Sequence, residues 1–554
     1  MVSRRIYNSI WLLSMKTEQR RFAAALNHVR KAQEQILFKI VVKNKDTEYG
    51  RKYGFSKIKS VADYQKAVPL SIYDDYLPYI ERISEGRQAV LTAEKVLLFE
   101  PSSGTVAATK YIPYTAELKK EFQRGIYPWL ADTYAGIPTL ISGSSYWSVT
   151  PPEGATKALG KVSVGFEADS SYLGAAVQIL LEKVFPVPPE IKKVDNMDAF
   201  RYITLLFLLK TSDLALLSVW NPTFLMLLLE PLPKWQDTLL TDLATGKIHP
   251  PDRVPANLLA KLEKRLGQHP QRAKELRTLF KKFSGSYSLL WPKLKLVSCW
   301  TDANAAAYVS AMQQLFPLAR IQGKGLLATE GLITIPYSLA GGNVLAVRSH
   351  FYEFIDQDNG QIKMSWELEK DKCYSVVLTT SGGLYRYRLL DLVKVTGFYK
   401  ECPFFAFIGK EEKVADYFGE KLHERFVLAA ITKLFVKYEL SPKFYMVAPE
   451  EKDGRTCYVL FAQPRDFAET SRWVRLVREL DAKLQENFHF SYCRKLGQLG
   501  ATQLFLIQHK GAEIYMAECK RQGQKLGNIK PTALHTRKGW ASKFIGEYVL
   551  RRTI

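Results

Sequence analysis

Apolar and polar residues alternate along this chain with two different periods, which predict helices in some segments and strands in others. Over 16–44, apolar side chains recur every three to four residues with lysine and arginine between them, which is typical of an amphipathic helix. A second helical zone covers 255–283, where basic residues lie between leucines. From 90 to 150 the apolar runs are short and are separated by Ser/Gly clusters, so we predict strands at 96–99 and 138–141.

Strand patterns dominate from 294 to 410, and strands alternate with helices over the whole of this first part. Such alternation favours an α/β domain whose mostly parallel sheets are flanked by helices. The remainder of the chain predicts a small α+β domain, with strands at 444–447, 456–461 and 503–507 and helices at 468–487 and 510–522. We therefore expect a large N-terminal domain, 1–410, and a small C-terminal domain, 411–554.

The most apolar region of the chain is 202–229. Lys210 and Asp213 interrupt it, and Asn221 and Pro222 lie within its second half. No apolar run reaches the roughly 20 residues that a membrane-spanning helix needs. The region is predicted to form two buried core segments, and no membrane span is expected.

Basic residues outnumber acidic ones, 78 to 55 among 554 residues, which gives a formal net charge of +23. An excess of this size suits nucleic acid, anionic lipid or a phosphorylated substrate. The surplus is dispersed along the chain, and the basic helical zone lacks the interleaved aromatic residues that base stacking requires. Charge therefore predicts no specific nucleic-acid partner.

The six cysteines stand far apart, at 299, 373, 402, 457, 493 and 519. No pair has CxxC spacing, and none lies near a histidine at zinc-finger distance. This usage predicts a reduced protein of the cytoplasm, without a disulfide framework. The first 14 residues lack the features of a signal peptide, because polar residues interrupt their short apolar stretch.

The first candidate for chemistry is a hydroxyl-rich segment, 101–110, that follows the predicted strand 96–99. It contains Ser102, Ser103 and Thr105 and ends at Lys110. Backbone N–H groups and hydroxyls of such a loop can bind phosphate oxygens, with the lysine supplying positive charge. The spacing of a Walker loop is missing, and an ordinary turn is the competing interpretation.

The second candidate is the pair Thr329 and Glu330, which lies between apolar runs. A carboxylate in this setting is a suitable ligand for a hard cation such as Mg²⁺ that bridges phosphate oxygens. The competing interpretation is a helix start, with Thr329 as the N-cap and Glu330 in the first turn. Local sequence leaves both open.

The third candidate covers 379–391, where glycines make a turn and alternating Tyr and Arg predict a strand. Arg386 and Arg388 would share one face of this strand, which ends at Asp391. Arginines can bind a phosphate, and the aspartate can accept hydrogen bonds from ribose hydroxyls. A structural ladder of ion pairs is the alternative. Farther on, Lys530 lies in a segment punctuated by Gly and Pro, which predicts a loop.

In their order and spacing, these motifs resemble the Gretchen Hagen 3 family of acyl-acid amido synthetases, a branch of the adenylate-forming, luciferase-like enzymes. The likeness covers nearly the whole chain. The matching segments are 47–51, 68–73, 219–225, 351–355, 383–391 and 419–422.

The resemblance implies a luciferase-like large domain, a mobile small domain, and a two-step reaction that uses ATP and Mg²⁺. A carboxylic acid is adenylated with release of pyrophosphate, and an amine such as an amino acid then displaces AMP. It further implies contacts to ATP from Ser102, Ser103, Thr105, Lys110, Thr329, Arg388, Asp391 and Lys410. Glu330 would bind the metal, and Lys530 would join Thr329 and Glu330 in catalysis, moving toward the adenylate with the small domain.

Several positions depart from the family pattern and suggest a bacterial-type member with an altered phosphate loop. Residues 106–108 read Val-Ala-Ala, Asn304 and Leu390 stand where glycine is usual, and Lys410 replaces an arginine. A lost glycine costs on the order of 1 kcal/mol where φ must be positive. Two alternatives therefore stay open beside the amido synthetase: an acyl-adenylate former that uses coenzyme A or an alcohol, and a catalytically weakened nucleotide-binding protein.

Overall fold

The computed structural model describes residues 2–102, 110–148, 158–165, 183–411, 414–415, 417–418, 420, 422–452, 454–465, 469–522 and 529–549. The chain forms two compact units. The first comprises Met1–Ser102, Lys110–Leu389 and Val393–Phe407, and the second contains Leu390–Leu392 and the chain from Ile408 onward. The assignment of the nucleotide and acid site to 1–410, and of mobility to 411–554, stays a prediction.

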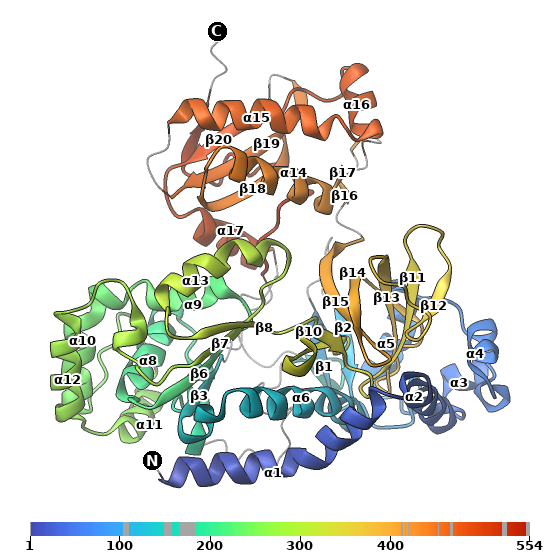
Figure 1. The fold of residues 1–554 in the computed structure, drawn as a ribbon, viewed down its shortest axis with the longest axis horizontal. Coiled ribbons are helices and arrows are strands. Elements are labelled where there is room, and N and C mark those ends of the chain that lie inside the picture. Colours follow the sequence, from blue (N-terminus) through green and yellow to red (C-terminus); the bar gives the residue numbers. More distant parts are fainter. Residues whose placement is uncertain are drawn as a thin grey trace. The chain divides into compact units, whose positions relative to one another are not determined.

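The first unit contains a four-stranded parallel sheet (Figure 1). Its strands, in spatial order, are β3 (Ser144–Trp147), β6 (Leu214–Ser218), β7 (Leu296–Cys299) and β8 (Arg320–Gly323). One face packs on a leucine-rich core with α8 (Met197–Lys210), α9 (Pro222–Leu229), α10 (Leu232–Thr245), α11 (Ala256–Leu266) and α12 (Pro270–Phe280). The region 202–229 is thus buried core, as predicted, and no helix in the described part is long and apolar enough to cross a bilayer.

The opposite face of this parallel sheet lies toward α6 (Ala116–Gly136). The rings of Trp129 on α6 and Trp147 on β3 are 6.4 Å apart, and Trp129 Nε1 donates to Gln322 Oε1 on β8 at 3.2 Å. Helix α1 (Val2–Ala25) runs alongside α6 (Figure 1). Helix α6 therefore packs against both the parallel sheet and α1.

A seven-stranded sheet forms the other half of the first unit. In spatial order it contains β12 (Ile362–Met364), β11 (Phe351–Asp356), β13 (Cys373–Thr379), β14 (Tyr387–Tyr399), β15 (Cys402–Lys410), β10 (Gly342–Leu345) and β9 (Thr334–Tyr337). The pairs whose register is described in this sheet are antiparallel. The predicted α/β class is confirmed. The parallel pairing that we expected for most strands is found in the four-stranded sheet, whereas the described pairs of the seven-stranded sheet are antiparallel.

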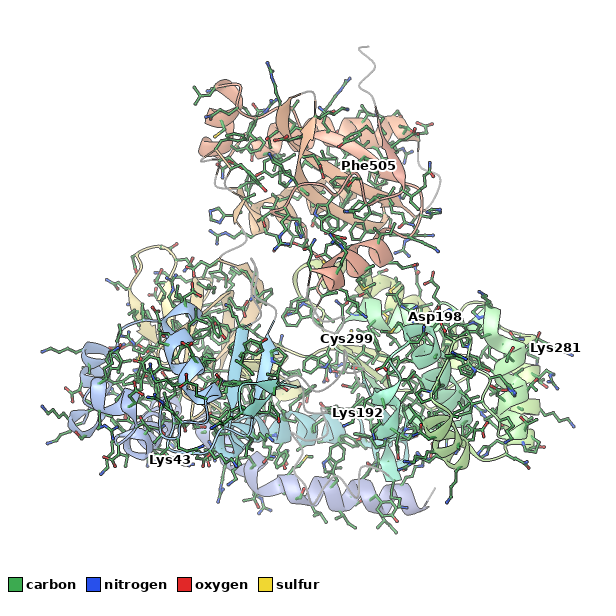
Figure 2. The ribbon with its side chains drawn as sticks, turned by 180° about the vertical axis from the view of Figure 1, so that it is seen from behind. Lys43, Lys192, Asp198, Lys281, Cys299 and Phe505 are labelled. Carbon is green, nitrogen blue, oxygen red and sulfur yellow. The ribbon has the colours of Figure 1, made fainter. Side chains whose placement is uncertain are left out.

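The second unit is a small α+β fold built on the sheet β18 (Pro442–Lys452), β19 (Arg455–Pro464), β20 (Gln503–Ile507) and β21 (Gly546–Tyr548). Alternate residues of β19 face opposite cores. Leu460 faces α14 (Glu424–Lys437) and α15 (Thr470–Leu484), whereas Phe461 shares its core with Phe505 and α17 (Gly511–Arg521). Phe505 lies inside this unit, while Lys43 and Lys281 project from the surface of the first (Figure 2).

Two local predictions differ from the structure. The single helix expected over 16–44 is the end of α1 followed by α2 (Val29–Asn44). Glu401, distant in sequence, bonds both sides of the break: its N–H donates to the Leu26 carbonyl, and its carboxylate accepts from Val29 N–H at 3.1 Å. The strand expected at 138–141 is a 3-10 helix, Pro138–Ser142, because a short apolar run starting with proline fits either structure.

Candidate active site

The hydroxyl-rich segment begins and ends on an antiparallel hairpin of the first unit. Ser102 ends β1 (Leu98–Ser102) and pairs in register with Lys110, which begins β2 (Lys110–Tyr114). Ser103, Thr105 and the altered stretch 106–108 lie outside the described residues. The two ends of the predicted phosphate loop are therefore adjacent, because they lie on neighbouring strands of the hairpin.

Lys110 lies beside two tyrosines. Its Nζ is 3.4 Å from the hydroxyl of Tyr387 and 5.8 Å from the ring centre of Tyr73. The hydroxyl of Tyr73 accepts a hydrogen bond from Tyr111 N–H at 2.6 Å. Burial raises the pKa of Tyr73 to about 12, and the negative charge of Glu330 adds to this shift. Lys110 thus lies between the side chains of Tyr73 and Tyr387.

Thr329 and Glu330 form the tip of a two-residue hairpin. Ala328 and Gly331 exchange backbone hydrogen bonds of 2.9 and 3.2 Å on either side of them. The hydroxyl of Tyr114, at the end of β2, donates to the carbonyl of Thr329 at 2.7 Å. Because strand β9 follows instead of a helix, the alternative interpretation as a helix N-cap is wrong.

Glu330 is 6% exposed at this tip, so its carboxylate is almost withdrawn from water. Within the described ranges, no group of three or more His, Cys, Asp or Glu residues could hold a metal ion by itself. Mg²⁺ in nucleotide sites is usually bound by one or two carboxylates, with substrate phosphates and water as the other ligands. A single buried carboxylate fits such a nucleotide-borne ion, and does not fit a resident metal with an all-protein ligand set.

The two arginines of the third motif have different environments. Arg386 has a φ of 46° and precedes β14, which begins at Tyr387, so the predicted strand with both arginines on one face is wrong. Arg386 is buried against Glu353, as the ion-pair alternative requires. Arg388 lies within β14, and its N–H donates to the Ser71 carbonyl at 2.8 Å. Its predicted contact with ATP stays a prediction.

Asp391, Lys410 and Lys530 belong to the second unit. Lys410 Nζ lies 3.1 Å from Oδ1 of the buried Asp391, so the structure brings two of the predicted ligands together. The carbonyl of Lys530 accepts from the hydroxyl of Tyr515 at 3.1 Å, and its side chain is exposed. The roles of these three residues stay predictions.

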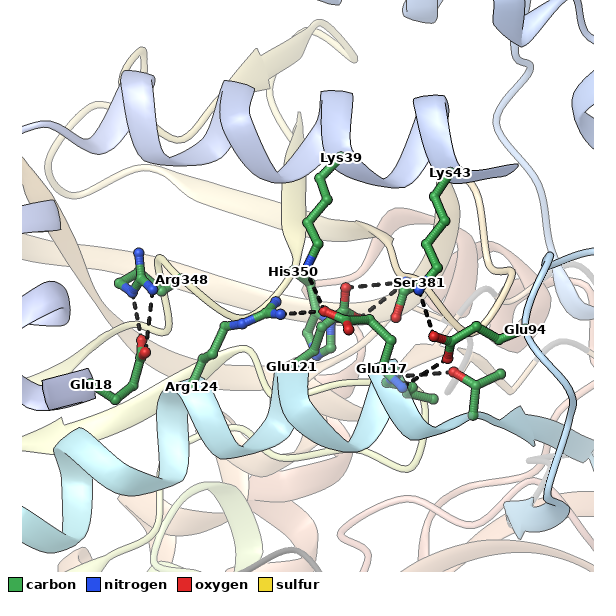
Figure 3. Close-up of polar contacts among 12 residues, drawn as sticks. Glu18, Lys39, Lys43, Glu94, Glu117, Glu121, Arg124, Arg348, His350 and Ser381 are labelled. Carbon is green, nitrogen blue, oxygen red and sulfur yellow. Dashed lines mark hydrogen bonds and ion pairs between the residues drawn. The ribbon is translucent and has the colours of Figure 1, made fainter. Parts of the chain in front are cut away.

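Sequence reasoning missed a buried pair that contacts two of the candidate loops. His350 Nδ1 lies 3.0 Å from Oε2 of Glu121 on α6 (Figure 3). The other ring nitrogen of His350 accepts from Leu332 N–H at 3.1 Å, and Glu121 accepts from Ser381 N–H at 3.1 Å. The one available signal was a glutamate on the apolar face of α6, between the buried Leu118 and Gly125.

Known proteins resemble this chain over nearly its whole length. A model described as the GH3 family N-terminal domain matches residues 18–321, and one described as the GH3 family central domain matches 343–410. The putative indole-3-acetic acid-amido synthetase GH3.9 of Arabidopsis thaliana is 24% identical over 539 residues, which cover 90% of each chain. The indole-3-acetic acid-amido synthetase GH3.3 of the same plant is 23% identical over 428 residues, covering 72% of this chain and 70% of that protein.

One solved structure that is similar is that of AtGH3.15 acyl acid amido synthetase in complex with 2,4-DB. It superposes with a TM-score of 0.84 at 19% identity, and the match covers 97% of this chain and 98% of that one. At this identity the likeness shows a shared fold, which includes both compact units. Roles for the candidate residues can therefore be proposed from their positions in this shared fold.

Proposed function

Since this chain belongs to the GH3 family, we propose that it is an ATP-dependent acyl-acid amido synthetase. The oxygen of a carboxylic acid attacks the α-phosphorus of ATP and releases pyrophosphate, which gives an acyl-adenylate. The nitrogen of an amine such as an amino acid then attacks the acyl carbon and releases AMP, forming an amide. The relatives named as amido synthetases support this reaction, as does the confirmed resemblance of the motifs to the family.

The observation that carries the proposal is the hydrogen bond from Tyr114 to the Thr329 carbonyl, which joins the Thr329–Glu330 hairpin to the strand that begins at Lys110. The buried carboxylate of Glu330 and the ammonium group of Lys110, distant in sequence, thereby lie on two elements that contact each other, beside a segment rich in hydroxyls. Phosphoryl chemistry needs such charges fixed in advance, because the developing charge is stabilised only by groups already in position. The hydrogen bond from Tyr114 holds the Thr329–Glu330 tip against the strand that bears Lys110.

In this proposal each candidate residue has a distinct role. Lys110 and the hydroxyls of Ser102, Ser103, Thr105 and Thr329 bind phosphate oxygens, and Arg388 adds positive charge. Asp391, held by Lys410, accepts the ribose hydroxyls. Glu330 would hold Mg²⁺, which neutralises phosphate charge when it is bound. Lys530 stabilises the negative charge that builds up during adenylation.

The proposal also places the protein in the cytoplasm. All six cysteines are free, and five of them are buried. Free thiols persist in a reducing compartment, whereas secreted proteins usually pair them.

The test is carboxylate-dependent exchange of pyrophosphate into ATP over a panel of aromatic and aliphatic acids. We expect exchange with at least one acid, and its loss in Glu330→Gln. Asp74→Asn is the matched control, because Asp74 adjoins Tyr73 but is exposed; it should keep most of the activity. Silence across the panel despite ATP binding would favour the nucleotide-binding alternative. Exchange followed by transfer to coenzyme A or an alcohol, but to no amine, would favour the other acceptor.

A further inference from the structure

We propose that Glu121 and His350 act as a buried positioning pair, which fixes the Thr329–Glu330 hairpin and the Ser381 turn relative to each other. This inference rests on the proposed function, because it concerns the rate of adenylation. In this proposal neither side chain contacts the substrate. The pair acts through the two loops whose backbone N–H groups it binds.

The hydrogen bonds define which ring nitrogen of His350 carries the proton. His350 Nε2 accepts from Leu332 N–H at 3.1 Å, so this nitrogen carries no proton, and the imidazole is neutral with its proton on Nδ1. Nδ1–H donates to Oε2 of Glu121 at 3.0 Å. The same carboxylate accepts from Ser381 N–H, at 3.1 Å to Oε2 and 3.3 Å to Oε1. A continuous chain of hydrogen bonds therefore runs from Leu332, two residues beyond Glu330, to Ser381. Figure 3 shows its part between His350, Glu121 and Ser381.

Both loops are packed tightly on this chain of bonds. A Cβ at Gly331 would lie 3.0 Å from the His350 ring, so the hairpin rests directly on the imidazole. A Cβ at Gly382, next to Ser381, would lie 2.9 Å from the carbonyl of Pro113 on β2. The turn at Ser381 leads into β14, which bears Arg388, and it leans on the strand that bears Lys110. A small shift of the pair would thus move groups on both sides of the proposed phosphate site.

The energetics argue against a purely structural role. Glu121 is 1% exposed and His350 is 0% exposed. In the described part of the chain, Glu121 is hydrogen-bonded to the neutral His350, and no lysine or arginine forms an ion pair with it. A buried carboxylate without a cation is costly, and apolar side chains of similar size would fill this space at lower cost. Glu117, one turn earlier on α6, has the usual compensation from Lys39 and Arg124 (Figure 3).

The test compares Glu121→Gln with Glu117→Gln, which alters the same helix but contacts neither loop. Hydrogen exchange is measured at the amides of Leu332 and Ser381, and kcat and KM are measured for acid-dependent pyrophosphate exchange. In Glu121→Gln we expect faster amide exchange at both positions, although Glu121 does not contact Leu332. We also expect kcat to fall by about tenfold or more, with KM for the acid changed little, because misplacement by a fraction of an ångström is enough. Glu117→Gln should change neither amide nor kcat.

Two results would overturn the inference: faster amide exchange at Ser381 alone, or a kcat in Glu121→Gln equal to that in Glu117→Gln. If Glu121→Gln does not fold, Glu121→Asp replaces it, since aspartate withdraws the carboxylate by one methylene. The expected results are the same: faster amide exchange at Leu332 and Ser381, and a lower kcat than in Glu117→Gln. If the wild-type protein shows no pyrophosphate exchange with any acid, the proposed function fails. The amide exchange at Leu332 and Ser381 then still decides whether the pair couples the two loops.

Discussion

The guanidinium group of Arg386 binds the carboxylate of Glu353 in the interior of the first unit. Nε lies 2.9 Å from Oε2 and Nη2 lies 3.0 Å from Oε1, so the contact is bidentate. Nη1 donates in addition to the backbone carbonyls of Gln65 and Val68. The pair thereby ties β11 and the start of β14 to the segment around 65–68, and all three nitrogens of the guanidinium fork donate hydrogen bonds in a geometry that only arginine provides.

We expect Arg386→Met to lower the free energy of unfolding by about 3–5 kcal/mol, because it leaves the Glu353 carboxylate buried and uncompensated. Chemical denaturation of the variant, of Glu353→Gln and of the double variant measures this. The double variant should lose less stability than the two single losses added together. Strict additivity would show that the two side chains do not interact.

The 3.1 Å contact between Lys410 and Asp391 predicts an effect on nucleotide binding. If Asp391 accepts the ribose hydroxyls, Lys410 keeps its carboxylate in position. Lys410→Met should weaken the affinity for a non-hydrolysable ATP analogue by about tenfold, the size of one charged hydrogen bond. Lys410→Arg should retain the affinity, because the positive charge remains. Calorimetric titration measures both, and equal affinities in all three proteins would remove Lys410 from the nucleotide site.

Leu390 has a φ of 64°, a left-handed conformation that favours glycine, at the position where glycine is usual in the family. The side chain is buried, so its loss must be separated from the relief of backbone strain. We therefore compare Leu390→Gly with Leu390→Ala, and expect the glycine variant to be the more stable by about 1 kcal/mol. At Leu389, which lies in β14 without a positive φ, the order should reverse. Thermal unfolding of the four variants checks this, and the alanine variant being more stable at both positions would contradict it.

Glu117 predicts how stability changes with pH. Burial alone raises the pKa of Glu117, but hydrogen bonds and charges from Lys39 and Arg124 outweigh it and hold the pKa below its ordinary value of 4.5. A carboxyl group with a lowered pKa stabilises the fold above its ordinary pKa, and this contribution is lost as the pH falls through the folded-state pKa. Glu117→Gln should therefore be less stable than the wild type at pH 7, and the difference should close below about pH 4.5. Thermal unfolding across this range tests it; a difference that does not vary with pH would refute the assignment.

Lys530→Ala should lower the rate of adenylate formation on the order of 100-fold, since it removes one charge that stabilises the transition state. Nucleotide affinity should change little, because the proposed contact forms only during the reaction. Lys543→Ala, another exposed lysine of the second unit, is the control and should behave as the wild type. Equal pyrophosphate exchange in Lys530→Ala and wild type would exclude Lys530 from the mechanism.

Local pattern predicted those elements whose periodicity is strong and whose ends carry their own signals. The strand at 503–507 is β20, and the helix at 510–522 is α17 with a difference of one residue at each end. The break between α1 and α2 escaped prediction, because the group that satisfies it, Glu401, comes from the far end of the first unit. The pairing direction of the larger sheet was equally hidden, since apolar alternation along a strand does not reveal its neighbour.

Sequence by itself determined the family and the α/β class, and it proposed Lys110, Thr329 and Glu330 as site residues, because motifs and periodicity are properties of neighbouring residues. Only the tertiary structure decided that Arg386 is an internal ion pair, and that Glu121 lies beside His350, 229 residues away. A buried carboxylate is stabilised by whichever donors the fold brings to it, and no local spacing records which donors those are. For that reason the candidate loops could be proposed from the sequence, whereas the groups that hold them in place could not.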